Sequence, residues 1–242
     1  PSHQFWSKAF NKTPIVKGHS IDLPPIYPEL NLYFDHVNVP TRPFDRGFKT
    51  RTGETLLTPE GNTLYEYFGV KLSGRFELDA TQSSGHYQFA LLADDGAILS
   101  FNHTGEMIEL VNNDGTHPTK MACATDTLYL EKGRPYQFNL DYHQGPKYHI
   151  ALMMMYRKVD DPSQIPAESV CGQSGNSLFF DSTQDPPEPT STYNSLLDRG
   201  WKVASKENFL LPESHIYDNP CNEPEPQFTD VGLDNINQTG FA

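Results

Sequence analysis

Two adjacent aspartates are the residues whose types and spacing point most directly to chemistry. Asp94 and Asp95 stand in the stretch "ALLADDGAILSFN", between two runs typical of buried strands, and Gly96 follows them. Adjacent like charges repel each other and are stabilised by a cation. Carboxylate oxygens favour Ca²⁺, which takes about six to eight oxygen ligands in irregular geometry, whereas histidines and cysteines at zinc-ligand spacing are missing. The pair therefore indicates a candidate calcium site.

The backbone at this pair must depart from a regular strand if both carboxylates are to bind one ion, because neighbouring residues on a strand point to opposite faces. Gly96 permits such a break. A cis peptide bond between Asp94 and Asp95 would bring both carboxylates to one side, at a cost of about 3 kcal/mol. The alternative interpretation is a plain solvated turn, since Asp-Asp-Gly also tolerates left-handed backbone geometry.

The segments that must position this pair alternate apolar and polar residues, which is the pattern of half-buried strands. The residues expected on the buried faces are Tyr87, Phe89, Leu91, Ala97, Leu99, Phe101, Tyr136, Phe138, Leu140, Tyr142, Tyr148, Ile150, Leu152 and Met154. The last two runs are joined by the turn "HQGPK" and are predicted to form a hairpin. Strands separated by Gly, Asn, Asp and Pro clusters, without a long amphipathic helix between them, predict an antiparallel sandwich or barrel.

The two ends of the chain differ in amino-acid composition from these central strands. Residues 159–242 are rich in proline and contain polar stretches such as "DSTQDPPEPTSTY". We expect them to form an extension that packs on the strands, with "RGWKV" and "NFLLPE" as anchors. Residues 1–28 are expected to form an N-terminal arm. The sequence begins "PSHQFW", without an initiator Met or a signal peptide, so we expect it to be processed or cut from a longer protein.

Charge and hydropathy exclude two classes of partner. The formal net charge of −13 argues against nucleic acid, which draws affinity from clustered Lys and Arg. The longest apolar candidate, "YHIALMMMY", falls short of the roughly 18 residues needed to cross a bilayer. We therefore expect neither nucleic-acid binding nor direct membrane insertion.

Three cysteines, Cys123, Cys171 and Cys221, are an odd number without metal-ligand spacing. Two interpretations stay open: one disulfide with one buried thiol, or three free thiols. The preferred pair is Cys171 with Cys221, because both lie in irregular, proline-bearing chain. Cys123 lies in the apolar "KMACA" and is expected to be a core thiol.

An ordered set of motifs resembles a known family. The run "FALLADDGAILSFN", then "NNDGTH", then "LYLEKGRPYQFNLDY" and "HIALMMMYR", is similar to the β-sandwich family named for the anthrax protective antigen. Yeast flocculins, fungal epithelial adhesins and bacterial adhesin sugar-binding modules carry this domain. The resemblance covers residues 29–158 and implies an all-β fold, an antiparallel sandwich with irregular N- and C-terminal extensions.

In the lectin branch of that family, two consecutive aspartates joined by a cis peptide bind one Ca²⁺, and an amide from the loop before the last long strand completes the site. The resemblance implies metal ligands at Asp94, Asp95 and Gln144. It also implies that sugar hydroxyls coordinate the same ion. Sugar-binding candidates around "YHQGPKY" are His143, Gly145, Lys147 and Tyr148, although solvated-turn or structural roles for these residues stay open. Asp114, in the turn "NNDGTH", is expected to be structural.

We therefore expect a calcium-dependent lectin module of an extracellular adhesin that binds cell-surface glycans as part of a larger or multivalent surface protein. The alternative is a metal-free assembly or structural module. A glycosidase is disfavoured because its two carboxylates stand about 5 to 9.5 Å apart across the substrate, and no nucleophile elbow is present. The sequon at Asn102 follows the aspartates closely, so a glycan there is expected to crowd the site, which favours a bacterial source.

Overall fold

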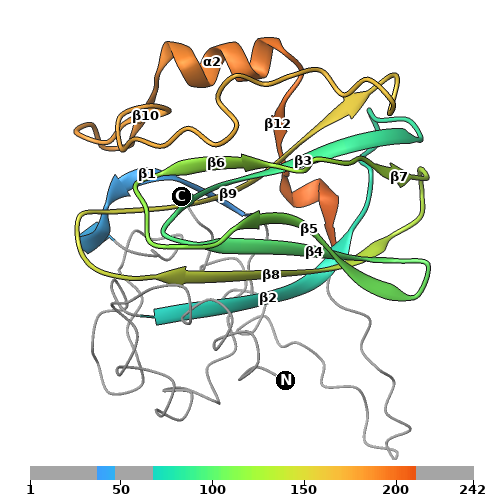
Figure 1. The fold of residues 1–242 in the computed structure, drawn as a ribbon, viewed down its shortest axis with the longest axis horizontal. Coiled ribbons are helices and arrows are strands. Elements are labelled where there is room, and N and C mark those ends of the chain that lie inside the picture. The colour runs from blue at the N-terminus through green and yellow to red at the C-terminus, as the bar shows by residue number, and fades with distance from the viewer. Residues whose placement is uncertain (1–36, 47–67, 211–242) are drawn as a thin grey trace, which may run out of the picture.

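The computed structural model describes residues 37–46 and 68–210, which form two packed antiparallel sheets (Figure 1). One sheet holds β1 (Asn38–Pro43), β9 (His149–Val159), β3 (Gly85–Asp94) and β6 (Lys120–Cys123) in that order, with β7 (Leu128–Leu130) also paired to β3 and β12 (Lys202–Val203) to β9. The other runs β13 (Phe209–Leu210), β2 (Phe68–Phe76), β8 (Tyr136–Gln144), β4 (Ala97–His103) and β5 (Glu106–Asn113). The prediction of an all-β antiparallel sandwich is confirmed.

The core lies between the two sheets, where the alternating residues meet. Phe89 and Leu91 from β3 face Leu99 from β4 and Leu140 from β8, and all four are fully buried. Edge-to-face aromatic contacts continue this core toward the end of β2, where the ring of Phe76 lies 5.4 Å from that of Phe89. The period-two pattern therefore predicted the buried faces of the central strands.

The predicted hairpin between the last two long strands is wrong. Both strands exist, but β8 pairs with β2 and β4, whereas β9 pairs with β1 and β3. The loop 145–148 therefore crosses from one sheet to the other. Alternation shows which face of a strand is buried, and in a sandwich two consecutive strands can bury their faces against each other without sharing hydrogen bonds.

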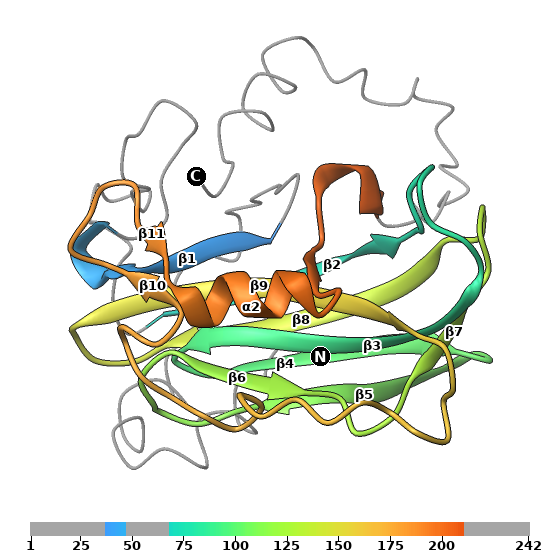
Figure 2. The ribbon, with the colours of Figure 1, turned by 90° about the horizontal axis from the view of Figure 1, so that it is seen from above.

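The outer face of the β1-β9-β3-β6 sheet is covered by the chain that follows β9. Figure 2 shows α2 (Ser191–Asp198) lying across β9 and β3. This second apolar layer joins sheet residues to residues of the following segment, namely Ala90, Leu92, Met121, Met153, Met155, Val170, Phe179, Phe180, Tyr193, Leu196 and Trp201. Trp201 and Phe209, from the two predicted anchors, lie at strands β12 and β13.

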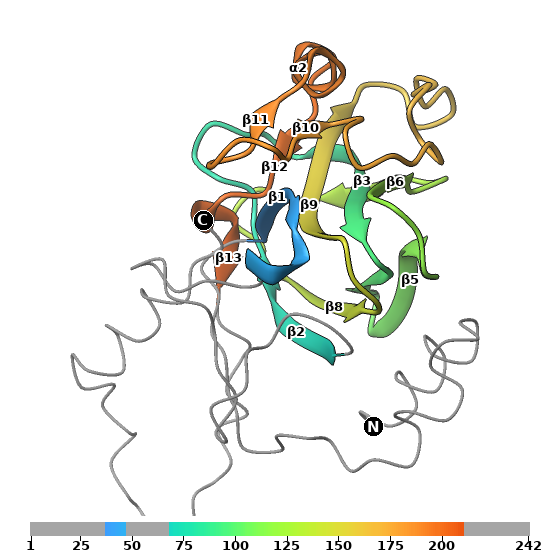
Figure 3. The ribbon, with the colours of Figure 1, turned by 90° about the vertical axis from the view of Figure 1, so that its left-hand side faces the viewer.

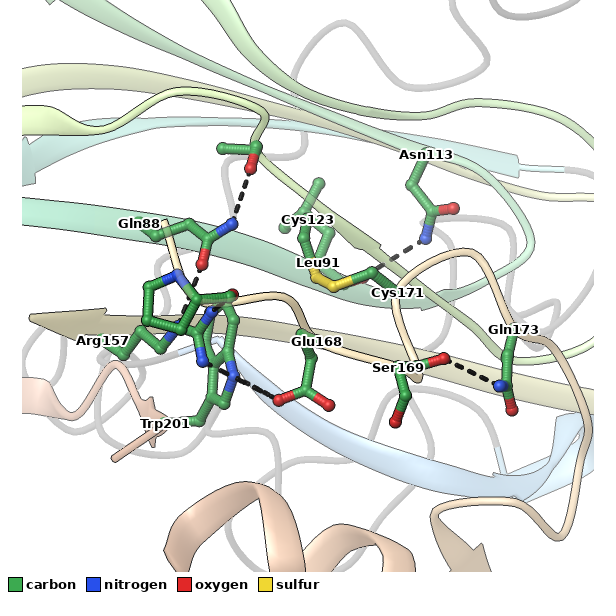
Figure 4. The surroundings of a disulfide bond; sticks show 12 residues. Gln88, Leu91, Asn113, Cys123, Arg157, Glu168, Ser169, Cys171, Gln173 and Trp201 are labelled. Carbon is green, nitrogen blue, oxygen red and sulfur yellow. Dashed lines mark hydrogen bonds and ion pairs between the residues drawn. A yellow bond between two sulfur atoms is a disulfide. The ribbon is translucent and has the colours of Figure 1, made fainter. Parts of the chain in front are cut away.

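A polar cluster and a disulfide hold this segment to the sheet (Figure 4). The Arg157 guanidinium lies 4.7 Å from the centre of the Trp201 ring and 3.8 Å from Glu168 Oε2. Arg199 also pairs with Glu168, at 2.8 Å. A bond joins Cys123 to Cys171, so the preferred pairing of Cys171 with Cys221 is wrong. Cys123 projects from β6 toward the covering segment rather than into the core between the sheets, and alternation alone does not say which side of a doubly covered sheet a residue faces.

Short elements complete the described chain. A 3-10 turn, η1 (Phe44–Arg46), follows β1; β10 (Phe180–Asp181) pairs with β11 (Glu188–Pro189); and η2 (Lys206–Asn208) precedes β13. Residues 1–28 lie outside the described residues, as does Cys221, and the division at residue 158 stays a prediction. None of the helices in 37–46 and 68–210 has the length and apolar character that a membrane crossing requires.

Candidate functional site

The acidic pair lies where the chain crosses between the two sheets. Asp94 is the last residue of β3, and β4 begins at Ala97 in the opposite sheet. The peptide bond between Asp94 and Asp95 is cis, as predicted. In Figure 2 the arrow of β3 ends on the left, at the same end as the loop from β8 to β9, and Figure 3 looks onto this end of the molecule. The loop from β5 to β6 also joins the two sheets and supplies the His117 amide described below. Three connections between the sheets, β3–β4, β5–β6 and β8–β9, therefore meet around the pair.

Asp95 is held by two backbone amides from different loops. Its side chain is buried, with 3% exposed. The amide of His117 donates to Asp95 Oδ1 at 3.0 Å, and the amide of Gly145 donates to Asp95 Oδ2 at 2.7 Å. A carboxylate offers about four lone-pair sites. Each oxygen of Asp95 is thus fixed in place and keeps capacity for a second ligand.

Asp94 is held from the side of its own sheet. The hydroxyl of Thr119 donates to Asp94 Oδ2 at 3.2 Å and accepts from the hydroxyl of Thr41 at 3.0 Å. The Thr119 backbone is itself fixed, since its amide donates to Asn176 Oδ1 at 3.2 Å. The Tyr142 hydroxyl lies 2.7 Å from the main-chain oxygen of Asp94. The chain after β9 therefore contributes, through Asn176, to the support of the acidic pair.

Burial gives both carboxylates unusual acid–base behaviour. Desolvation, followed by repulsion from Asp95, raises the pKa of Asp94 to about 8. Desolvation raises the pKa of Asp95 to about 6, although the hydrogen bonds from Gly145 and His117 oppose this shift. Within the described part of the chain, neither aspartate belongs to a salt bridge. Ionising both carboxylates would therefore concentrate negative charge that no salt bridge in the described part of the chain offsets.

Gln144, the predicted amide ligand, is fully buried at the end of β8. Its Oε1 lies 2.5 Å from the Tyr142 hydroxyl, and its Nε2 donates to the main-chain oxygen of His149 at 3.0 Å. The side chain thereby fixes both ends of loop 145–148. The group from this loop that reaches the acidic pair is the amide of Gly145. A ligand role for Gln144 stays a prediction.

The sugar-binding candidates separate into buried and exposed residues. Lys147 and Tyr148 are exposed, and Tyr148 has 77% of its surface accessible. The expectation that Tyr148 belongs to the buried alternation is wrong, because β9 begins one residue later. Gly145 is buried against Asp95, where an added Cβ would lie 3.1 Å from Asp95 Oδ2.

His143 does not line the rim of the site, contrary to the prediction. Its side chain is only 1% exposed and packs beneath Gly96, where an added Cβ would come 2.2 Å from His143 Cε1. Burial lowers the pKa of His143 to about 4, with an opposing contribution from Asp114. A strand residue before a loop can face inward, and the sequence did not show which face His143 takes. The imidazole is therefore neutral near pH 7 and supports the turn.

Two residues that the sequence analysis did not single out belong to the site. His117, whose amide holds Asp95, is the last residue of "NNDGTH", which was expected to be structural, and Thr119 lies two residues after it. Asp114 is half-buried there, and its amide donates to Asn112 Oδ1 at 3.1 Å. A threonine and a main-chain amide are common everywhere, so only the position of this turn, directly before β6, could have marked them.

Asn102 does not crowd the acidic pair. It lies near the far end of β4, paired with Met107 of β5, whereas the pair precedes the start of β4. Closeness along the chain does not imply closeness in space once a strand of about 3.3 Å per residue intervenes. The position of Asn102 therefore does not favour a bacterial source.

The two packed antiparallel sheets, with an acidic pair at the crossing between them, define a β-sandwich domain. Residues 55–168 match the family model of the PA14 domain. The resemblance to the protective-antigen family is thereby confirmed. No curated protein matches the chain.

Several solved structures are similar to part of the chain. A PA14 sugar-binding domain from an RTX adhesin is 24% identical, with a TM-score of 0.29, over 48% of this chain and 59% of that one. The epithelial adhesin 6 A domain from Candida glabrata, in complex with Galβ1-3GlcNAc, is 14% identical, with a TM-score of 0.35, over 52% and 61%. A β-glucosidase from Kluyveromyces marxianus, in complex with glucose, is 23% identical, with a TM-score of 0.30, over 45% and 12%. The chain thus covers less than two thirds of each of these structures.

Proposed function

We propose that this chain is a calcium-dependent carbohydrate-binding module of a cell-surface adhesin, with Asp94 and Asp95 as the metal ligands. The PA14 domain supports the class of module. The observation that carries the proposal is the burial of two adjacent carboxylates, 5% and 3% exposed, without a salt bridge among the described residues. Buried charges are normally paired or bind metals.

The residues present fit calcium better than other common ions. The oxygens at and next to the pair are those of the two carboxylates and the Thr119 hydroxyl, and Gln144 Oε1 is connected to Asp94 through the Tyr142 hydroxyl. In the described ranges, no group of three His, Cys, Asp or Glu side chains is placed to bind a metal. Calcium accepts carbonyl, amide, water and hydroxyl oxygens beside two carboxylates, whereas structural zinc sites require a complete set of side-chain ligands.

Hydrogen bonds within the protein orient both carboxylates without a bound ion. Amides of His117 and Gly145 orient Asp95, and the hydroxyl of Thr119 orients Asp94. Bound calcium would neutralise the pair and offer open coordination positions to neighbouring sugar hydroxyls. Tyr148 and Lys147, both exposed on the adjoining loop, would contact the sugar ring and its hydroxyls.

The expected affinity and setting follow from this geometry. A site with one ion and a few hydrogen bonds to a hydrated sugar recovers little net free energy, so binding of single sugars should be weak and adhesion should depend on multivalency. The disulfide between Cys123 and Cys171 supports an oxidising, extracellular setting. We therefore place the module in a larger or multivalent surface protein that binds cell-surface glycans.

A glycan array probed in millimolar calcium, and again in excess EDTA, tests the proposal. The wild-type protein should bind a subset of glycans in calcium only, and Asp95→Asn should bind none. Asp126→Asn is the matched control, because Asp126 is an exposed aspartate in the loop between β6 and β7 and should leave binding intact. Binding that survives EDTA, or that Asp95→Asn retains, would contradict the proposal. An absence of glycan binding in every condition would favour a metal-free assembly module instead, and steady sugar release from bound oligosaccharides would indicate an enzyme.

A further inference from the structure

A polar pocket of about 440 Å³ lies at the opposite end of the sandwich from the acidic pair. It is bounded by the end of β4, the β4–β5 turn, β7 and the loop 131–135, which lie at the right in Figure 1. The lining side chains used below are Asn102, Tyr129, Arg134, Tyr136 and Gln137. The strand β4 separates the two ends by roughly 20 Å. The pocket is therefore independent of the candidate calcium site.

The pocket combines arginine side chains with aromatic surface. The Arg134 guanidinium lies over the Tyr136 ring, 5.2 Å from its centre, which orients the guanidinium. The Tyr136 ring is fixed in turn, because its hydroxyl accepts the amide of Glu131 at 2.9 Å. Tyr129, which also lines the pocket, is 44% exposed, and its ring centre lies 5.2 Å from that of His86. Arg75 also lines the pocket.

Arg134 is available to an anionic ligand. Its described partner is Glu131, at 3.3 Å, and both side chains are more than half exposed, at 61% and 53%. Exposed ion pairs of this kind contribute little net free energy, so a ligand carboxylate can take the place of Glu131. A guanidinium binds a carboxylate through two parallel hydrogen bonds, which makes it the side chain best suited to that group.

The other lining groups match a sugar ring. Amide side chains, here Asn102 and Gln137, can donate to and accept from hydroxyls. An exposed aromatic ring such as Tyr129 offers an apolar face with a polar edge, which suits the C–H face of a pyranose. A volume of about 440 Å³ is within the range of pockets that hold small ligands.

We infer that this pocket is a second, calcium-independent saccharide site, selective for sugars that carry a carboxylate. Arg134 binds the carboxylate, Tyr129 packs against the ring, and the amides of Asn102 and Gln137 bind hydroxyls. The candidate calcium site would bind sugar hydroxyls through its ion, so the two ends of the domain recognise different groups of a glycan. The chain's net charge of −13 opposes an acidic sugar only at long range, where salt screens it beyond about 8 to 10 Å.

Isothermal titration calorimetry in EDTA tests this site. The probe is a tetrasaccharide of alternating glucuronic acid and N-acetylglucosamine, and the neutral control is the tetramer of N-acetylglucosamine. Wild-type protein should bind the acidic probe about tenfold or more tightly than the neutral one, which is the discrimination expected from one charge-assisted hydrogen-bonded pair. Arg134→Gln should lose about tenfold in affinity for the acidic probe, and Tyr129→Ala should also weaken binding.

Two further variants distinguish binding at this pocket from a general charge effect and from binding at the candidate calcium site. Lys132→Gln removes a positive charge from the same loop, and its ammonium group hydrogen-bonds Ala80 outside the pocket, so affinity should change by about twofold or less. Asp95→Asn should leave the acidic probe's affinity unchanged. The inference fails if the acidic probe does not bind in EDTA, if Lys132→Gln weakens binding as much as Arg134→Gln, or if Asp95→Asn abolishes it.

Discussion

The hydroxyl of Thr119 donates to Asp94 Oδ2 at 3.2 Å while it accepts from Thr41 at 3.0 Å, so one carboxylate is oriented through two successive hydroxyl groups. Thr119 is in turn held by Asn176, from the chain that covers the outer face of the sheet. The candidate metal site therefore depends on three separate stretches of sequence on this side alone.

Replacing Thr119 by valine tests that dependence. Thr119→Val removes the hydrogen bond to Asp94, which raises the pKa of that carboxyl further and so weakens cation binding near neutral pH. We expect calcium affinity, measured by calorimetric titration at pH 7, to fall about three- to tenfold, as one lost hydrogen bond to a charged group implies. Thr119→Ser, which keeps the hydroxyl, should bind calcium nearly as well as the wild type. Equal losses in both variants would show that the methyl group, not the hydroxyl, matters.

The raised pKa values of the aspartates predict how the calcium-free protein responds to pH. A pKa of about 8 for Asp94 and about 6 for Asp95 means that the folded state holds more protons than the unfolded state between about pH 4 and 8. Stability linked to this pair is therefore fully present below about pH 4 and is lost as the pH rises through 6 and 8. Thermal unfolding in EDTA should show a falling Tm across this window.

Asp94→Asn should flatten that pH dependence, because it removes the buried charge of the higher-pKa carboxyl. In EDTA at pH 8 it should stabilise the fold by about 1 kcal/mol or more, since one pKa unit corresponds to about 1.4 kcal/mol. In calcium the order should reverse: wild type gains about 2.7 kcal/mol when calcium is at 100 times its Kd, and the variant gains little. Asp126→Asn should follow the wild type in both buffers. A variant less stable than the wild type at pH 8 in EDTA would contradict the electrostatic account.

Gly96 is required by the packing of His143. An added Cβ at Gly96 would lie 2.2 Å from His143 Cε1 and 2.8 Å from the Gly115 amide nitrogen. Gly96→Ala should therefore destabilise the fold by about 1–3 kcal/mol, measured by urea unfolding. Adding His143→Ala to Gly96→Ala should recover part of that loss, whereas His143→Ala alone should cost stability. Strictly additive effects would mean that the imidazole is not the group the methyl meets.

The Cys123–Cys171 bond should contribute measurably to stability. It closes a loop with a sequence separation of 48, for which the chain-entropy model gives about 4 kcal/mol and experiments typically give about 2–4 kcal/mol. Cys123→Ser with Cys171→Ser should lower the free energy of unfolding by that amount. Cys221→Ser, which leaves this bond intact, is the control. An equal loss of stability in Cys221→Ser and in the double variant would instead support the pairing of Cys171 with Cys221.

Much of the fold could be predicted because alternation reports burial directly. Phe89, Leu99 and Leu140 stand at every second position of their strands and occupy the core. Which strands pair with each other was harder to predict, because the same alternation fits both a hairpin and a crossing between two sheets. The segment after β9 was harder still, since its apolar residues, such as Phe179 and Trp201, are sparse and bury themselves against a sheet face that the pattern had left unassigned.

The candidate site likewise contains some residues that could be predicted from the sequence and others that could not. The acidic pair and its cis bond could be predicted, because two adjacent carboxylates before a glycine are uncommon and the resemblance gave them a role. Thr119, the amides of His117 and Gly145, and the inward turn of His143 could not, because they depend on how three inter-sheet loops meet. Main-chain donors carry no sequence signature at all.

The Arg157–Glu168–Trp201 cluster determines how long a segment of this chain must be to fold when it is moved to another protein. A gene fragment ending at Val159 would encode every long strand, yet its product would expose Met121, Met153 and Met155 to water. We therefore expect a transferred segment to fold only when it extends past Trp201. The segment that can fold by itself is therefore longer than the family match. A fragment that ends with that match, at residue 168, should be insoluble.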